Sequence, residues 1–169
     1  MNVPGTPGSY PVGRNTDVDG ATPAESRPNV LHVPAGDGIA LWVPEEPPSN
    51  PADAAGQHSS TYTFMATVDS AGAALAVVDT VVPSGNGQAE HVHEDTDESF
   101  YVLDGEFLVC AGDESFVIKP GDYALVPRGM SHHWKNVSTG TSRMIRMYTP
   151  VGHERYFFEI NRPAPREMP

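Results

Sequence analysis

The chain has 169 residues, 38% of them hydrophobic, which suffices for one globular domain with a single core. Ten Lys and Arg against 22 Asp and Glu give a net charge of −12, and no Lys or Arg occurs between Pro28 and Ile118. This composition argues against a nucleic-acid partner, because binding phosphate requires clustered cations. A single cysteine, Cys110, excludes a disulfide framework.

The first 27 residues are rich in Pro and Gly and poor in aliphatic side chains, so we expect a flexible N-terminal arm over residues 1–27. Residues 28–169 are expected to form one domain. The start of the chain lacks the pattern of a signal peptide, and no apolar stretch approaches the length of a membrane span. We therefore expect a soluble, cytoplasmic protein with no membrane partner.

Short apolar runs separated by turn residues dominate the rest of the chain and predict strands. A first strand is expected at Ile39–Val43, followed by an irregular stretch over residues 45–59 that is a candidate lid over a site. Asp104-Gly105 is a strong hairpin signal. Many short strands at this spacing predict an all-β antiparallel sandwich or barrel. The further predicted strands cover residues 61–68, 73–82, 98–103, 106–111, 115–119, 123–126, 132–137 and 143–149.

Only the segment 152–160 has a helical pattern, and it is predicted to be a short C-terminal helix. We expect its Phe157-Phe158 pair to close one end of the barrel.

Three histidines and one glutamate form a candidate metal site. His91 and His93 are two residues apart, so in an extended segment both point to the same face. Glu98 lies shortly after them, and His132 follows on a later predicted strand. Three imidazoles and a carboxylate near turns suit a divalent transition metal with coordination positions left open. His32, His58 and His153 have no partner in the sequence and are assigned no role.

Candidate substrate-binding residues follow from strand parity. Phe100 and Val102 share the parity of Glu98, and Trp134 shares that of His132, so these side chains would line one cavity if Glu98 faces inward. Phe100 and Trp134 would then either stack against a planar substrate or pack in the barrel core. The face of Tyr62 borders either that cavity or the opposing sheet. Arg146 is a cation inside an apolar strand. We expect it to face outward and pair with an acid, whereas an inward position would allow it to bind an anionic group of a ligand.

Two motifs in the sequence resemble those of the cupin superfamily. The first consists of Gly85, His91, His93, Glu98 and Gly105 at their spacing, and the second of Gly121, Pro127, Gly129, His132 and Asn136. The resemblance implies a small jelly-roll barrel whose metal is bound by His91, His93, Glu98 and His132. Segments 98–106 and 149–159 are similar to single-domain quercetin dioxygenase-like cupins, which are metal-dependent oxygenases of flavonols and related aromatics. Related cupins commonly pair, so the resemblance also implies a homodimer.

Three functions are compatible with such a site. The first hypothesis is an oxygenase that uses O₂ on a planar enolic or phenolic substrate of flavonoid or polyketide type, with Glu98 acting both as ligand and as proton acceptor. The alternatives are a redox-neutral cyclase or isomerase of aromatic polyketide type, and a non-catalytic small-molecule-binding cupin. The ligand set accepts iron, nickel, manganese, cobalt, copper or zinc, so the identity of the divalent metal stays open.

Overall fold

The computed structural model describes residues 30–43, 59–70, 74–160 and 162–163. The predicted N-terminal arm and almost all of the predicted lid lie outside these residues. Within them, the chain forms eleven strands and one short helix, in the order β1 (Ile39–Val43), β2 (Ser60–Ala66), β3 (Ala76–Val82), β4 (Gly87–His91), β5 (Asp97–Asp104), β6 (Phe107–Ala111), β7 (Glu114–Ile118), β8 (Tyr123–Val126), β9 (His132–Asn136), β10 (Ser142–Thr149), α1 (Arg155–Ile160) and β11 (Arg162–Pro163).

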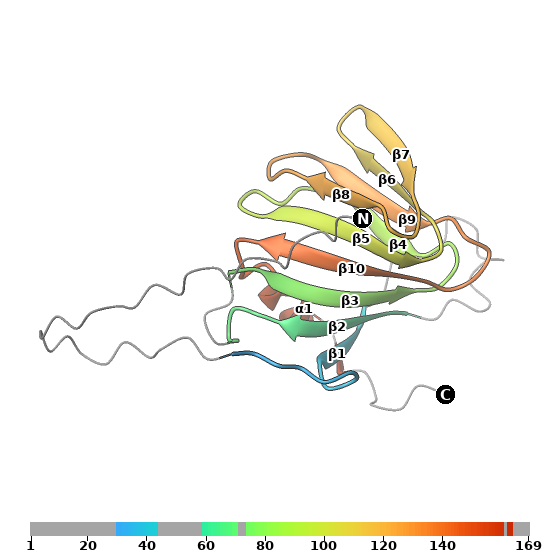
Figure 1. The fold of residues 1–169 in the computed structure, drawn as a ribbon. Coiled ribbons are helices and arrows are strands. Elements are labelled where there is room, and N and C mark those ends of the chain that lie inside the picture. The colour runs from blue at the N-terminus through green and yellow to red at the C-terminus, as the bar shows by residue number, and fades with distance from the viewer. Residues whose placement is uncertain (1–29, 44–58, 71–73, 161, 164–169) are drawn as a thin grey trace, which may run out of the picture.

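The strands form two antiparallel sheets that make up a jelly-roll barrel (Figure 1). The larger sheet has the order β11-β1-β2-β3-β10-β5-β8, and the smaller sheet has the order β4-β9-β6-β7. Neighbours in these sheets are often far apart in the sequence: β10 lies between β3 and β5, and β9 lies between β4 and β6. This crossing order brings the two predicted metal-binding segments side by side.

Regular alternation of buried residues with half-buried or exposed ones places the core between the sheets. In strands β3 and β10 every second residue is buried, so one face of each strand packs inward. The inward side chains include Val78 and Val82 from β3 and Met144 and Tyr148 from β10, all at most 1% exposed. The predicted all-β fold is confirmed.

Most predicted strands are found with shifts of one to three residues at their ends. Strand β2 ends at Ala66 rather than at residue 68, and its pairing with β3 shifts register between Phe64 and Ala66. Strand β4 was not predicted, because Gly87–His91 shows no alternation of buried and exposed residues. Its extended form follows from pairing with β9, which the local sequence does not reveal.

The predicted C-terminal helix is present but shorter than expected, at Arg155–Ile160. Phe157 is 2% exposed and packs edge-on against Tyr62 at a ring-centroid distance of 5.4 Å. Phe158 lies 4.7 Å from the ring of Phe64. Both partners belong to β2, so the Phe157-Phe158 pair attaches the helix to the core of the larger sheet. Among the described residues, no helix combines the length and the apolar character needed to cross a membrane.

Two residues of the motifs have structural rather than chemical roles. Gly105 has φ of 75°, and a Cβ atom there would lie 1.8 Å from Oγ of Ser142, so only glycine fits this hairpin. Asn136 is buried, and its Nδ2 donates to the carbonyl oxygens of Val82 and Gly140. Its Oδ1 accepts hydrogen bonds from the backbone of Ser138 and from Oγ of Ser142. Asn136 therefore ties together the turns at one end of the barrel.

Candidate metal centre

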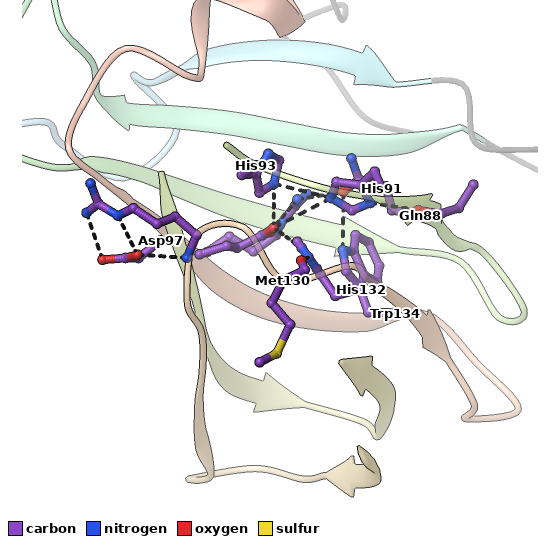
Figure 2. A network of polar contacts seen from close by, with 11 residues as sticks. Gln88, His91, His93, Asp97, Met130, His132 and Trp134 are labelled. Atoms are coloured by element: carbon purple, nitrogen blue, oxygen red, sulfur yellow. Dashed lines mark hydrogen bonds and ion pairs between the residues drawn. The ribbon is translucent and has the colours of Figure 1, made fainter. Parts of the chain in front are cut away.

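Four side chains that are separated in the sequence meet inside the barrel (Figure 2). His91 is the last residue of β4, and His93 follows in the connection to β5. Glu98 lies on β5 and His132 begins β9. One ligand atom from each residue lies within 4.8 Å of the ligand atoms of the others. These are the four residues that the motifs implied.

Backbone carbonyl groups set the orientation of two of the imidazoles. Nδ1 of His91 donates to the carbonyl oxygen of Ala89 at 2.7 Å, and Nδ1 of His132 donates to that of Met130 at 3.0 Å. A proton on Nδ1 leaves Nε2 as the atom with a free lone pair. Both Nε2 atoms face the centre of the cluster, and each can bind a metal when its ring is neutral.

Three of the distances between donor atoms match those expected around one metal ion, and Nε2 of His91 lies farther from Oε2 of Glu98, at 3.9 Å. Nε2 of His91 lies 3.2 Å from Nε2 of His93, and Oε2 of Glu98 lies 3.0 Å from Nε2 of both His93 and His132. Two donors at about 2.1 Å from one ion lie about 3.0 Å apart at a right angle and about 3.4 Å apart at the tetrahedral angle. The cluster is thus suitable for a transition metal, with nitrogen donors that favour such ions over calcium or magnesium.

Arg146 was expected to face outward, but it faces inward and is fully buried. Its partner is Glu98, whose Oε1 accepts a hydrogen bond of 2.7 Å from Nε of Arg146. Burial alone would raise the pKa of Glu98, but the charge of Arg146 and the hydrogen bonds from the histidines outweigh it and hold the pKa well below its usual range. Glu98 is therefore an anion in the closed interior.

A surface ion pair fixes the loop beside the cluster. Nε and Nη2 of Arg128 donate to the two carboxylate oxygens of Asp97 at 2.9 and 3.0 Å, and the backbone nitrogen of Arg128 also donates to Asp97. These hydrogen bonds lower the pKa of Asp97 to about 2. Because Asp97 precedes Glu98 and Arg128 lies in the turn before His132, the pair connects both halves of the site at the surface (Figure 2).

A cavity of about 380 Å³ opens beside His93. Its walls come from the β4–β5 connection and from the segment between β10 and α1, and consist of Val92, His93, Glu94, Asp95, Thr96, Pro150, Val151, Gly152 and His153. The ring of His153 lies 4.0 Å from that of His93. Burial, together with the nearby His93, lowers the pKa of His153 to about 4, so its imidazole is neutral at neutral pH.

His153 is a residue of the site that the sequence did not reveal, since no local spacing connects it to the other histidines. Gln88 and Tyr148 also escaped prediction. Gln88 accepts hydrogen bonds from Trp134 and Arg146, and Tyr148 packs against both His93 and His153. The one signal for Tyr148 in the sequence was its position in β10, because alternation along that strand puts Tyr148 on the inward face.

The candidate substrate-binding residues all lie in the barrel interior. None of them is more than 1% exposed, and none lines the cavity described above; they are Tyr62, Phe100, Val102, Trp134 and Arg146. Tyr62 and Trp134 pack against the guanidinium of Arg146, each with a ring centroid 4.9 Å from its Cζ. Their role in binding a substrate stays a prediction.

Comparison with known proteins agrees with the fold and the site. Residues 77–148 match the sequence profile of the cupin domain family. This stretch contains all four clustered residues. It also contains the strands β3 to β10, except for the first residue of β3 and the last residue of β10. Residues 77–148 are therefore matched as one cupin domain.

The chain is similar in sequence to parts of two characterised proteins. The chain is 33% identical over 100 residues to quercetin 2,3-dioxygenase of Bacillus subtilis, a match that covers 58% of this chain but 28% of that protein. It is 25% identical over 85 residues to the polyketide synthase CurC of Streptomyces cyaneus, covering 50% of this chain and 55% of that protein. The chain thus spans less than two thirds of either relative.

A solved structure supports the fold. The crystal structure of a predicted oxalate decarboxylase from Thermotoga maritima superposes with a TM-score of 0.57 at 17% identity, covering 73% of this chain and all of that one. At this identity, the similarity concerns the fold alone.

Proposed function

We propose that the protein is a metal-dependent oxygenase of quercetin dioxygenase-like type that acts on a planar enolic or phenolic compound. The observation that carries the proposal is the convergence of three imidazole nitrogens and one carboxylate oxygen beside a cavity that reaches His93. The similarity to a quercetin 2,3-dioxygenase supports the reaction class.

The residues that would hold the ion are His91, His93, Glu98 and His132. A bound divalent metal would supply the redox and Lewis-acid chemistry of the reaction. Glu98 and Tyr148 are fully buried, so this part of the site would be shielded from bulk water. Glu98 is also the proposed acceptor of the substrate's hydroxyl proton. Because Arg146 occupies Oε1, the proton would go to Oε2, so Glu98 would have to leave the metal in order to accept it.

The cavity walls restrict the kind of substrate. Pro150 and Val151 supply apolar surface, whereas Glu94 and Asp95 carry negative charge, and no lysine or arginine lines the cavity. These carboxylates would repel a dianionic substrate as it enters the cavity. A neutral enol or phenol that loses its proton only inside the site avoids this cost. The cavity therefore favours a substrate that is neutral when it enters.

The test is oxygen consumption by the protein loaded separately with iron, nickel, manganese, cobalt, copper and zinc. Each form is offered flavonols, catechols and enolic polyketide analogues, and uptake is followed with an oxygen electrode. We expect uptake with at least one metal and one compound, and its loss in His132→Ala. The control is His133→Ala, which changes the neighbouring histidine on the opposite face of β9. Absence of uptake across the whole panel would reject the oxygenase.

A second candidate function is a redox-neutral cyclase or isomerase of aromatic polyketide type. The similarity to the polyketide synthase CurC favours it. In this case the residues would bind the same ion, which would polarise a carbonyl group without using O₂. Turnover of a polyketide analogue under argon at the aerobic rate would support this candidate, whereas strict dependence on O₂ would support the oxygenase.

A further inference from the structure

The buried guanidinium of Arg146 is held in one position by its neighbours. Its Nη2 donates to Oε1 of Gln88 at 2.7 Å, and the same oxygen accepts a hydrogen bond of 3.2 Å from Nε1 of Trp134. The rings of Tyr62 and Trp134 both lie 4.9 Å from its Cζ. An arginine that contacts two aromatic rings and is hydrogen-bonded at two of its nitrogens has little freedom to rotate.

The two carboxylate oxygens of Glu98 have different partners. Oε1 accepts the hydrogen bond from Nε of Arg146 at 2.7 Å and lies 2.6 Å from Nη2. Oε2 lies 3.0 Å from Nε2 of His93 and 3.0 Å from Nε2 of His132. One oxygen therefore faces a fixed cation, and the other faces the donor atoms of the cluster.

A carboxylate can bind a metal through one oxygen or through both. Binding through both would require Oε1 to leave Arg146 and turn toward the ion. That movement would leave a buried guanidinium without its anionic partner, which is strongly unfavourable in a closed interior. The charge-assisted bonds to Arg146 thus compete directly with a second bond from Glu98 to the metal.

We propose that Arg146 is a positioning residue that reserves Oε1 of Glu98, so that Glu98 offers the metal a single oxygen. Glu98 then takes up one coordination position instead of two, and the position saved stays available to substrate or to a second small molecule. This role rests on metal binding by the four residues, but it does not depend on whether the reaction uses O₂.

The direct test is the structure of the protein loaded with cobalt(II). In the wild-type protein we expect one oxygen of Glu98 within about 2.5 Å of the ion, and two in Arg146→Met. In solution, the visible d–d absorption of cobalt(II) should weaken in Arg146→Met, because the absorption falls as the coordination number rises. Arg146→Lys keeps the charge but lacks the two-pronged contact, and it should give an intermediate spectrum.

Arg143→Met is the matched control. Arg143 lies on the same strand, β10, but it is exposed and pairs with Asp79 on the outer surface. Its cobalt spectrum should equal that of the wild type.

Failure of Arg146→Met to fold does not remove the test, because the wild-type structure is decisive by itself. Two oxygens of Glu98 on cobalt in the wild-type protein would overturn the proposal. An Arg146→Met protein that folds and still binds through one oxygen would also overturn it. If the wild-type protein binds no cobalt, the metal site itself fails, whereas inactivity toward O₂ alone leaves the role of Arg146 unaffected.

Discussion

The backbone nitrogen of Gly129 donates a hydrogen bond of 2.8 Å to the carbonyl oxygen of His93. This bond joins the two halves of the metal centre, since His93 follows β4 and Gly129 lies in the turn that leads to His132. Gly129 has φ of 78°, a left-handed conformation that favours glycine. The two histidine-bearing segments are therefore held together by the backbone before any ion binds.

Metal binding should stabilise the protein by an amount that depends on the cluster. At a free cobalt(II) concentration of about 100 times Kd, binding adds about 2.7 kcal/mol, or roughly 5–10 °C in melting temperature. The measurement is differential scanning fluorimetry after treatment with EDTA, with and without cobalt. His132→Ala should lose the shift and His133→Ala should keep it. An equal shift in both variants would contradict the proposed ligand set.

Closing the cavity should separate substrate access from metal binding. Val151 lines the cavity beside His93. A tryptophan there would occupy much of the space, so Val151→Trp should abolish oxygen uptake with any compound that the wild-type protein oxidises. Its cobalt-dependent melting shift should persist. Val137→Trp, at an exposed position, is the control and should retain both. Full activity in Val151→Trp would mean that the substrate enters elsewhere.

Asn136→Ala should be strongly destabilising. The side chain makes four hydrogen bonds that join the turns around Val82, Ser138 and Gly140. Removing it leaves buried donors and acceptors without partners, and we expect a loss of about 3 kcal/mol in the free energy of unfolding. Urea denaturation followed by tryptophan fluorescence measures this. Thr139→Ala, exposed in the same turn, should change stability by less than about 0.5 kcal/mol.

Gly105→Ala and Gly140→Ala make a matched pair. At Gly105 an added Cβ would overlap the side chain of Ser142, and φ is positive, whereas at Gly140 nothing lies within 4 Å of the added atom. We expect a loss of about 2 kcal/mol for Gly105→Ala from overpacking and backbone strain. Gly140→Ala should be neutral or slightly stabilising in the same urea titration. Equal midpoints would show that the hairpin can relax around the added methyl group.

Phe157→Ala tests whether the short helix α1 belongs to the core. Its ring contacts Tyr62 and Phe64 and is 2% exposed, so truncation should cost about 3–5 kcal/mol. The neighbouring Tyr156 is 53% exposed, and Tyr156→Ala should cost less than about 1 kcal/mol. A small effect for Phe157→Ala would indicate that the helix packs only loosely on β2.

The sequence by itself determined the all-β class, most of the strands and the four residues that converge. Alternation along a strand fixes which side chains share a face, so His91 and His93, or Glu98 and Phe100, could be grouped without coordinates. Strand β4 was missed because its residues do not alternate, and its extended form depends on pairing with β9.

Only the tertiary structure decided what surrounds those four residues. The pairing of Arg146 with Glu98 requires β10 to lie beside β5, and the contact of His153 with His93 requires the segment after β10 to turn back over the site. Neither relationship has a local signal, because each depends on the order of strands in the sheet. The expected orientation of Arg146 was also wrong. An unpaired cation belongs at the surface, but a cation with a carboxylate partner on the neighbouring strand can lie in the core.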